Sequence, residues 1–167
     1  MIGVGYCRAH LRSRWGLDIT PADNPTHGLR LRAVGDPDQV IFKKGENIAY
    51  YNGEEVTKQE MDARYGNATA PYGIRYRSKN PNTEWYEDAA CRRGVGSLAN
   101  HKSRSQANAT FAVEHKDGDL LGAIKAVKPI KGGQEIFVDY NNSKTNNYQF
   151  NKPGVSYSTS IKNMKFL

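Results

Sequence analysis

The stretch IKGGQEIFVDY at residues 130–140 decides the fold. A Lys-Gly-Gly turn stands near its start, and a strand is expected over residues 134–140. Successive side chains of a strand point to opposite faces, so Ile136, Val138 and Tyr140 would share one face. The sequence therefore predicts a strand with an apolar face that ends on a tyrosine.

The rest of the chain consists of short segments separated by turns. Glycine is frequent, with 16 in 167 residues. The segment LRLRA at residues 29–33 alternates apolar and basic side chains, which is typical of a half-buried strand. Residues 40–42 and 47–51 flank the turn KKGE at residues 43–46. Many short strands and few helices are therefore expected.

One helix is well indicated. Thr57 and Glu60 have the spacing of a capping box, in which each side chain bonds the backbone of the other residue. Gly66 stands where a helix would end. The sequence therefore predicts a helix over residues 58–65.

Composition limits the class of protein. A chain of 167 residues fits one domain, and 38% hydrophobic with 25% charged residues is typical of a globular one. No apolar run approaches the roughly 18 residues that span a bilayer, and the first residues do not form a secretory signal. A nuclear or cytoplasmic location, without secretion, is expected.

Charge and cysteine content narrow the partners. The net charge of +7 favours an acidic or nucleic-acid partner, although a solvated basic surface explains it equally well. Cys7 and Cys91 are too few for a disulfide scaffold or a four-cysteine zinc site. Cys7 and His10 have the spacing of half a zinc site, but no clear partners, so no metal is expected.

Four segments in order resemble the SET domain, a family of protein-lysine methyltransferases that use S-adenosylmethionine. They are HGLRLRA at 27–33, KGENIAYYNGE at 44–54, the segment from DAA at 88–90 through NH at 100–101 to ANA at 107–109, and residues 130–140. Together they extend from about residue 28 to residue 140.

The resemblance implies a mainly β fold with short helices, an α+β SET fold of short strands in small sheets. The Asn-His segment would be threaded against the strand ending at Tyr140, in a pseudoknot-like exception to ordinary chain topology. Residues 27–141 would form the SET domain, and residues 1–26 a flanking segment packed on it. Residues 142–167 would be a tail and a candidate cover of the active site, through Tyr148, Phe150 or Tyr157.

The resemblance also implies site residues. Tyr140 would be catalytic, its phenol orienting the substrate amine and the methyl group. The residues expected to hold the cofactor lie in the first and third segments: Gly28, Leu29, Arg30, Asn100 and His101. Arg30 departs from the family pattern, which has a second glycine there. Lys102 and Ser103 replace the usual Ser-Cys, and about two extra residues precede Asn108.

Tyr51, Tyr72 and Val138 match positions that line the lysine channel in relatives. An apolar slot with aromatic faces suits a lysine side chain. Core packing explains each tyrosine about as well. Val138 is smaller than the Phe or Tyr of relatives, which leads to the hypothesis that more than one methyl group can be added.

The resulting prediction is an enzyme that transfers a methyl group from S-adenosylmethionine to a lysine of a histone or another basic protein. A nucleosome or DNA contact through the basic surface is a further possibility. Two alternatives stay open. Arg30 and Lys102 motivate a catalytically inactive SET-like binding module, and the charge motivates a basic nucleic-acid-binding domain with a chance resemblance.

Overall fold

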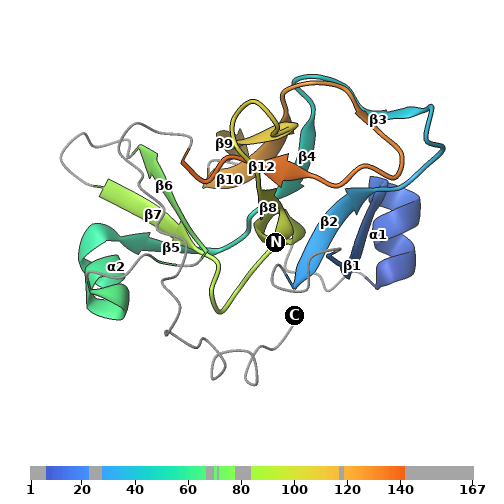
Figure 1. Ribbon diagram of the computed structural model, residues 1–167. Helices are drawn as coiled ribbons and strands as arrows, with labels where there is room; N and C mark the ends of the chain where they lie inside the picture. Colours follow the sequence, from blue (N-terminus) through green and yellow to red (C-terminus); the bar gives the residue numbers. More distant parts are fainter. Residues whose placement is uncertain are drawn as a thin grey trace.

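A computed structural model describes residues 7–22, 28–66, 70, 72–77, 84–116 and 119–141 (Figure 1). Its elements, in chain order, are α1 (Arg8–Trp15), β1 (Leu17–Pro21), β2 (Leu29–Ala33), β3 (Val40–Phe42), β4 (Asn47–Tyr50), β5 (Glu54–Thr57), α2 (Lys58–Tyr65), β6 (Gly73–Arg77), β7 (Glu84–Asp88), the 3-10 helix η2 (Val95–Leu98), β8 (Asn100–His101), β9 (Ala109–Lys116), β10 (Asp119–Ala126), β11 (Ile130–Lys131) and β12 (Phe137–Val138).

The strands form several small sheets, which confirms the predicted α+β class. Their orders are β1-β2, β4-β10-β9, β11-β3, β12-β8 and β5-β7-β6. Every named strand pair is antiparallel except β12 with β8, which is parallel. The sheet that carries α2 lies at one end of the view and β1-β2 with α1 at the other (Figure 1).

Helix α2 spans the predicted residues because its start signal is local. Thr57 Oγ1 accepts from the Glu60 backbone N–H at 3.2 Å, and Glu60 Oε2 accepts from the Thr57 N–H at 2.7 Å. The chain leaves the helix at Gly66, whose N–H donates to the Asp62 carbonyl. The Tyr65 hydroxyl donates to the buried carboxylate of Asp88 at 3.0 Å, which ties α2 to β7.

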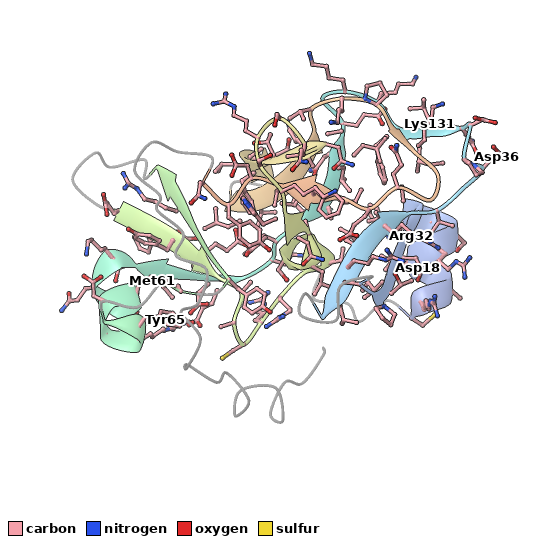
Figure 2. The ribbon with its side chains drawn as sticks, in the orientation of Figure 1. Asp18, Arg32, Asp36, Met61, Tyr65 and Lys131 are labelled. Carbon is pink, nitrogen blue, oxygen red and sulfur yellow. The ribbon has the colours of Figure 1, made fainter. Side chains whose placement is uncertain are left out.

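Helix α1 was not predicted. Its N-cap, Cys7, makes no capping bond with its side chain, so the sequence carries no local start signal. A contact with β1 holds it instead: Arg8 Nε and Nη2 donate to the two oxygens of buried Asp18 at 2.7 and 2.8 Å. This hydrogen bonding lowers the pKa of Asp18. In Figure 2, Asp18 and Tyr65 mark the opposite ends of the molecule.

One strand prediction needs correction, and the KKGE turn connects strands that do not pair with each other. Strand β3 pairs with β11, and β4 pairs with β10. The turn instead contacts the end of β10, where Gly45 N–H donates to the Ala126 carbonyl at 2.8 Å. The last strand is also shorter than residues 134–140, because regular pairing is limited to β12.

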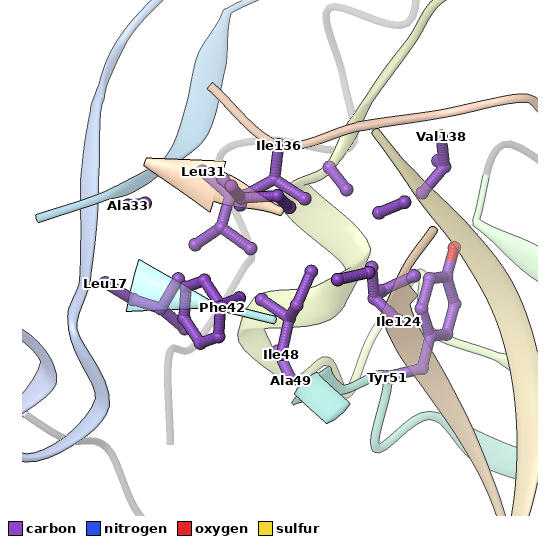
Figure 3. Close-up of a cluster of buried hydrophobic side chains, with 14 of the residues drawn as sticks. Leu17, Leu31, Ala33, Phe42, Ile48, Ala49, Tyr51, Ile124, Ile136 and Val138 are labelled. Carbon is purple, nitrogen blue, oxygen red and sulfur yellow. The ribbon is translucent and has the colours of Figure 1, made fainter. Parts of the chain in front are cut away.

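A core cluster joins the small sheets (Figure 3). Leu31, Ile136 and Val138 are fully buried in it, as the alternation in β2 and in the last strand predicts, and Ile124 of β10 is fully buried beside them. Leu29 departs from that alternation and is 41% exposed. Among the described residues, no helix is sufficiently long and apolar to cross a membrane.

Candidate functional site

The C-terminal strand passes between two parts of one earlier loop. On one side, Phe137 and Val138 of β12 pair with Asn100 and His101 of β8. On the other side, Asn108 Oδ1 accepts from the Phe137 N–H at 2.8 Å, and the Phe137 carbonyl accepts from the Asn108 N–H at 3.2 Å. This arrangement is the predicted pseudoknot-like threading. The extra residues before Asn108 lie in an exposed turn and leave these contacts in place.

Tyr140 is fixed at both its backbone and its hydroxyl. Its N–H donates to His101 Nδ1 at 3.0 Å, and its hydroxyl donates to the Ala99 carbonyl at 3.0 Å. Because the hydroxyl hydrogen is used in this bond, the phenol oxygen can serve any further partner only as an acceptor. The threading therefore delivers an oriented acceptor oxygen next to β8.

The protonation of His101 follows from the same contacts. Nδ1 accepts a backbone N–H, so this nitrogen carries no proton and a neutral ring has its hydrogen on Nε2. The carboxylate of Asp139 lies 3.8 Å from Nδ1, but the two atoms do not form an ion pair, because Nδ1 carries no proton. His101 thus acts here as an acceptor that positions the Tyr140 backbone.

An aromatic chain, defined as Tyr51, Phe111, Tyr140 and His101, runs through the site. The ring centroids of Tyr51 and Phe111 are 6.1 Å apart, those of Phe111 and Tyr140 6.2 Å, and those of Tyr140 and His101 5.2 Å. Burial, with further contributions from Tyr140, Glu87 and Tyr72, raises the pKa of Tyr51 well above its usual value. The Tyr51 phenol is therefore desolvated and un-ionised.

The other predicted channel residues adjoin this chain. Val138 is fully buried in the same core cluster as Tyr51 (Figure 3). Tyr72, which directly precedes β6, packs against the core cluster. The Arg93 guanidinium lies over its ring, 3.9 Å from the centroid. The structure thus brings Tyr51, Tyr72 and Val138 to one region, with a cation already stacked on one ring.

A polar cluster, defined as Arg30, Asn100 and Glu135, lies beside the aromatic chain. Asn100 Nδ2 donates to the Leu29 carbonyl at 3.1 Å and to Glu135 Oε1 at 2.9 Å. Arg30 Nη1 lies 3.8 Å from Glu135 Oε2, and Arg30 Nε donates to Thr20 Oγ1 at 2.8 Å. The first and third predicted segments are therefore joined through Glu135.

Among the described residues, open space adjoins this cluster at Gly28. The residue has φ +68°, a conformation that favours glycine, and no described atom lies within 4 Å of the point where a Cβ would stand. The next residue, Leu29, exposes its apolar side chain. Gly28, Leu29, Arg30 and Asn100 are thus grouped as predicted, and His101 follows Asn100 on β8.

A buried carboxylate supports the strand that carries Tyr51. Glu87 is 2% exposed, and its two oxygens accept from the backbone N–H groups of Gly53 at 2.5 Å and Gly122 at 2.7 Å. The Gly122 carbonyl accepts in turn from the Tyr51 N–H at 2.8 Å. Burial raises the pKa of Glu87, while the two N–H groups oppose that rise. A Cβ at Gly122 would press against Glu87 Oε2, so this close approach favours glycine.

Sequence reasoning did not assign roles to Glu135, Phe111, Arg93 or Glu87. Glu135 stands within the deciding stretch and Phe111 within an alternating strand, but their partners are remote in the sequence. Tyr148, Phe150 and Tyr157 lie outside the described residues. Cys7 Sγ lies 3.1 Å from His10 Nδ1 at an exposed site, and no group of three metal-binding side chains occurs among the described residues.

Comparison with known proteins identifies similar folds. The family model of the SET domain matches residues 39–141. A Chaetomium thermophilum polycomb repressive complex 2 is similar, with a TM-score of 0.58 and 21% identity over 74% of this chain and 15% of that chain. A ctPRC2 complex in an autoinhibited conformation bound to S-adenosylmethionine gives a TM-score of 0.60 and 20% identity, over 78% of this chain and 16% of that one.

The SET domain of ATXR5 in complex with histone H3 gives a TM-score of 0.60 and 14% identity, over 78% of this chain and 59% of that one. At these identities the likeness establishes the fold. The chain spans 15% of the length of the polycomb chain and 59% of the ATXR5 chain. No curated protein sequence matches the chain.

Proposed function

This chain belongs to the SET-domain family, and from that premise we propose that it is an S-adenosylmethionine-dependent protein-lysine N-methyltransferase. The observation that carries the proposal is the fixed orientation of the Tyr140 hydroxyl by the Ala99 carbonyl, 3.0 Å away. Membership of the family also excludes an unrelated nucleic-acid-binding domain with a chance resemblance.

The polar cluster and Gly28 fit the cofactor. The open space at Gly28 allows close approach to its backbone, and exposed Leu29 offers an apolar surface. Asn100 is held by Leu29 and Glu135, so its backbone is fixed beside that space. S-adenosylmethionine, when bound, supplies a methyl carbon on a positively charged sulfur, and the carbon–sulfur electron pair remains on sulfur when the methyl leaves.

The aromatic chain fits the lysine. The amine must lose a proton to solvent before its lone pair can form the new carbon–nitrogen bond, and an apolar environment favours the neutral form. The Tyr140 oxygen, limited to accepting, can accept one of the two remaining amine N–H groups and align the nitrogen. Tyr51, Tyr72 and Val138 would form the walls around the lysine side chain.

A histone or another basic protein is the proposed substrate, and a nuclear location would accompany a histone substrate. One similar structure, ATXR5, is in complex with histone H3. The acidic side of this chain lies on β5 and α2, where Glu55 and Glu60 are exposed. Glu54 and Asp62 on the same elements are already paired with Arg64 and Lys58. Because the Glu60 carboxylate already accepts from the Thr57 N–H, substrate attraction would depend mainly on Glu55.

An inactive binding module is the second candidate, because Arg30 occupies the position of a glycine. Arg30, however, is drawn into the ion pair with Glu135, and Lys102 places its ammonium 4.2 Å over the Phe137 ring. Both are thus engaged away from the Tyr140 hydroxyl, which favours the enzyme.

Transfer of labelled methyl from S-adenosylmethionine to core histones and to a mixed protein extract tests the proposal. We expect label on lysine with the wild type, and little label with Tyr140→Phe. Cofactor binding without transfer to any protein in either mixture would contradict a histone substrate. An absence of both cofactor binding and transfer would favour the inactive module.

A further inference from the structure

Three exposed loops lie side by side at one edge of the molecule: the turn at residues 43–46, the loop at residues 102–107 and the turn at residues 127–129. Backbone hydrogen bonds join them. The Ala126 N–H donates to the Glu46 carbonyl at 3.0 Å, and the Val127 N–H donates to the Asn108 carbonyl at 2.9 Å. The loops before β4, after β8 and after β10 meet at the top of Figure 1.

These loops form a basic face, defined as Lys43, Lys44, Lys102, Arg104 and Lys128. All five side chains are exposed, and the only acidic residue in the three loops is Glu46. Five positive charges less one negative charge leave four of the net seven in this small part of the sequence. Figure 2 shows nitrogen-tipped side chains projecting from this edge, beyond the labelled Lys131.

Several basic side chains elsewhere on the described surface have carboxylate partners, which the side chains of the basic face lack. Elsewhere Arg8 pairs with Asp18, Lys58 with Asp62, Arg75 with Glu84 and Lys125 with Glu114, as given by the ion pairs of the structure. In the described part of the chain, no carboxylate pairs with any of the five basic side chains. Unpaired like charges on adjoining loops repel one another, so an anionic partner would relieve that repulsion.

The face adjoins the candidate site. The Lys102 N–H donates to the Val138 carbonyl at 3.0 Å, and the Lys102 ammonium lies over the Phe137 ring. Both partners belong to β12, the strand that leads to Tyr140. An anionic partner bound to this face would therefore lie close to the site, next to β12.

We propose that the basic face binds the phosphate backbone of double-stranded nucleic acid. Lysine and arginine neutralise phosphates, and Ser103, Ser105 and Gln106 supply the hydroxyl and amide groups that also contact phosphate. The face has neither the amphipathic helix nor the aromatic side chains that insert into a membrane surface. In combination with the proposed function, this surface would bring the enzyme to a basic protein that is itself bound to nucleic acid.

Fluorescence polarisation with a labelled 30-base-pair duplex, in the absence of S-adenosylmethionine and protein substrate, tests the proposal. The wild type should bind with an affinity that falls steeply as salt rises. The variant Lys43→Glu/Lys44→Glu/Lys128→Glu should bind at least about tenfold more weakly, with a salt slope smaller by about 0.9 for each phosphate contact removed. The neutral variant Lys43→Gln/Lys44→Gln/Lys128→Gln should show an intermediate loss.

A charge-matched control, Arg14→Glu/Lys58→Glu/Arg75→Glu, changes the same number of charges away from the face. It should bind within about threefold of the wild type, because the change in net charge alone has a small effect. Equal losses in the two glutamate variants, or no binding by the folded wild type at low salt, would overturn the proposal. Binding to phosphatidylserine vesicles but not to the duplex would overturn it in favour of a membrane. Each result is independent of methyl transfer, so it leaves the test of the enzyme separate.

Discussion

The polar cluster and the aromatic chain lie side by side but are held by different forces. Arg30, Asn100 and Glu135 depend on charge and hydrogen bonds between segments that are remote in the sequence. Tyr51 and Phe111 depend on ring packing and on exclusion of water, and Tyr140 adds hydrogen bonds to two residues close by in the fold, His101 and Ala99. The difference suggests a division of work, in which the polar cluster governs cofactor affinity and the aromatic chain governs the rate of transfer.

Tyr140→Phe should have the largest effect. The substitution removes the acceptor oxygen while it keeps the ring, so we expect the rate at saturation to fall by about 100-fold or more. Cofactor affinity should change less than about threefold. Initial-rate kinetics with separate cofactor titrations measure both quantities. The matched control is Tyr65→Phe, which removes a hydroxyl bound to Asp88 on α2; a rate loss as large in this control would contradict the division.

Glu135→Gln should have the opposite profile. Glutamine can still accept from Asn100 but carries no charge for Arg30, and loss of that charge should weaken cofactor binding by about tenfold. The rate at saturating cofactor should stay within about threefold of the wild type. Calorimetric titration and initial rates give the two values. Glu84→Gln, which removes the partner of Arg75 on β7, is the control and should leave both values unchanged.

Some features of the fold and of these two regions could be predicted from the sequence, and others could not. Helix α2 was predicted to the residue because Thr57 and Glu60 lie within one turn of each other. The roles given to Tyr51 and Tyr72 and to the Asn100-His101 pair come from the resemblance and stay predictions. Helix α1 was not predicted, since its anchor is the tertiary contact between Arg8 and Asp18.

The role of Glu135 was also beyond sequence reasoning. Its partners are 35 residues away at Asn100 and further still at Arg30, and only the threading of the last strand brings them together. The partners of β3 and β4 could not be predicted for a related reason. The two strands are neighbours in sequence, but each pairs with a strand from the C-terminal half.

The main effect of Glu87→Gln should be on the stability of the fold. Folding raises the pKa of Glu87 above its ordinary 4.5, so the folded protein binds more protons than the unfolded chain in the window between these two values. Wild-type stability should therefore decline as pH rises through that window, while the variant shows a flatter profile. At neutral pH the variant also loses one of two N–H bonds, which costs about 1–3 kcal/mol.

Urea unfolding of the wild type and Glu87→Gln at several pH values measures this effect. The control is Asp38→Asn, whose side chain is almost fully exposed and remote from Glu87, and which should leave the profile unchanged. If wild-type stability rose across the same window, the burial of Glu87 would not be the controlling factor. If Glu87→Gln also lowered the rate of methyl transfer at a pH where the variant is fully stable, Glu87 would support the aromatic chain through Tyr51.

Phe111→Leu should have the smallest effect. The substitution keeps an apolar side chain but removes ring contacts with Tyr51 and Tyr140, each worth about 0.5–1.5 kcal/mol. We expect a loss of stability of about that size, with a rate loss of a few-fold and unchanged cofactor affinity. Urea unfolding and initial rates measure these quantities. A selective loss of cofactor affinity would mean that the two regions are not separate.

The size of Val138, beside the aromatic chain, leads to a further prediction about the number of methyl groups added. Because valine is smaller than a phenyl ring, we expect di- and trimethyl-lysine to accumulate with time, and Val138→Leu to shift the product toward monomethyl-lysine. Mass spectrometry of a methylated substrate distinguishes these products. Only monomethyl-lysine from the wild type at long times would refute the hypothesis. A thermal melt of Val138→Leu checks that the larger side chain is tolerated in the core.

Calorimetric titration of S-adenosylmethionine into the folded wild-type chain tests the central claim most directly, because the enzyme needs the cofactor and the inactive module does not. The account predicts saturable binding at one site, with a dissociation constant between about 1 µM and 1 mM, weakened by Glu135→Gln and little changed by Tyr140→Phe. No saturable heat from a chain that circular dichroism shows to be folded would contradict it.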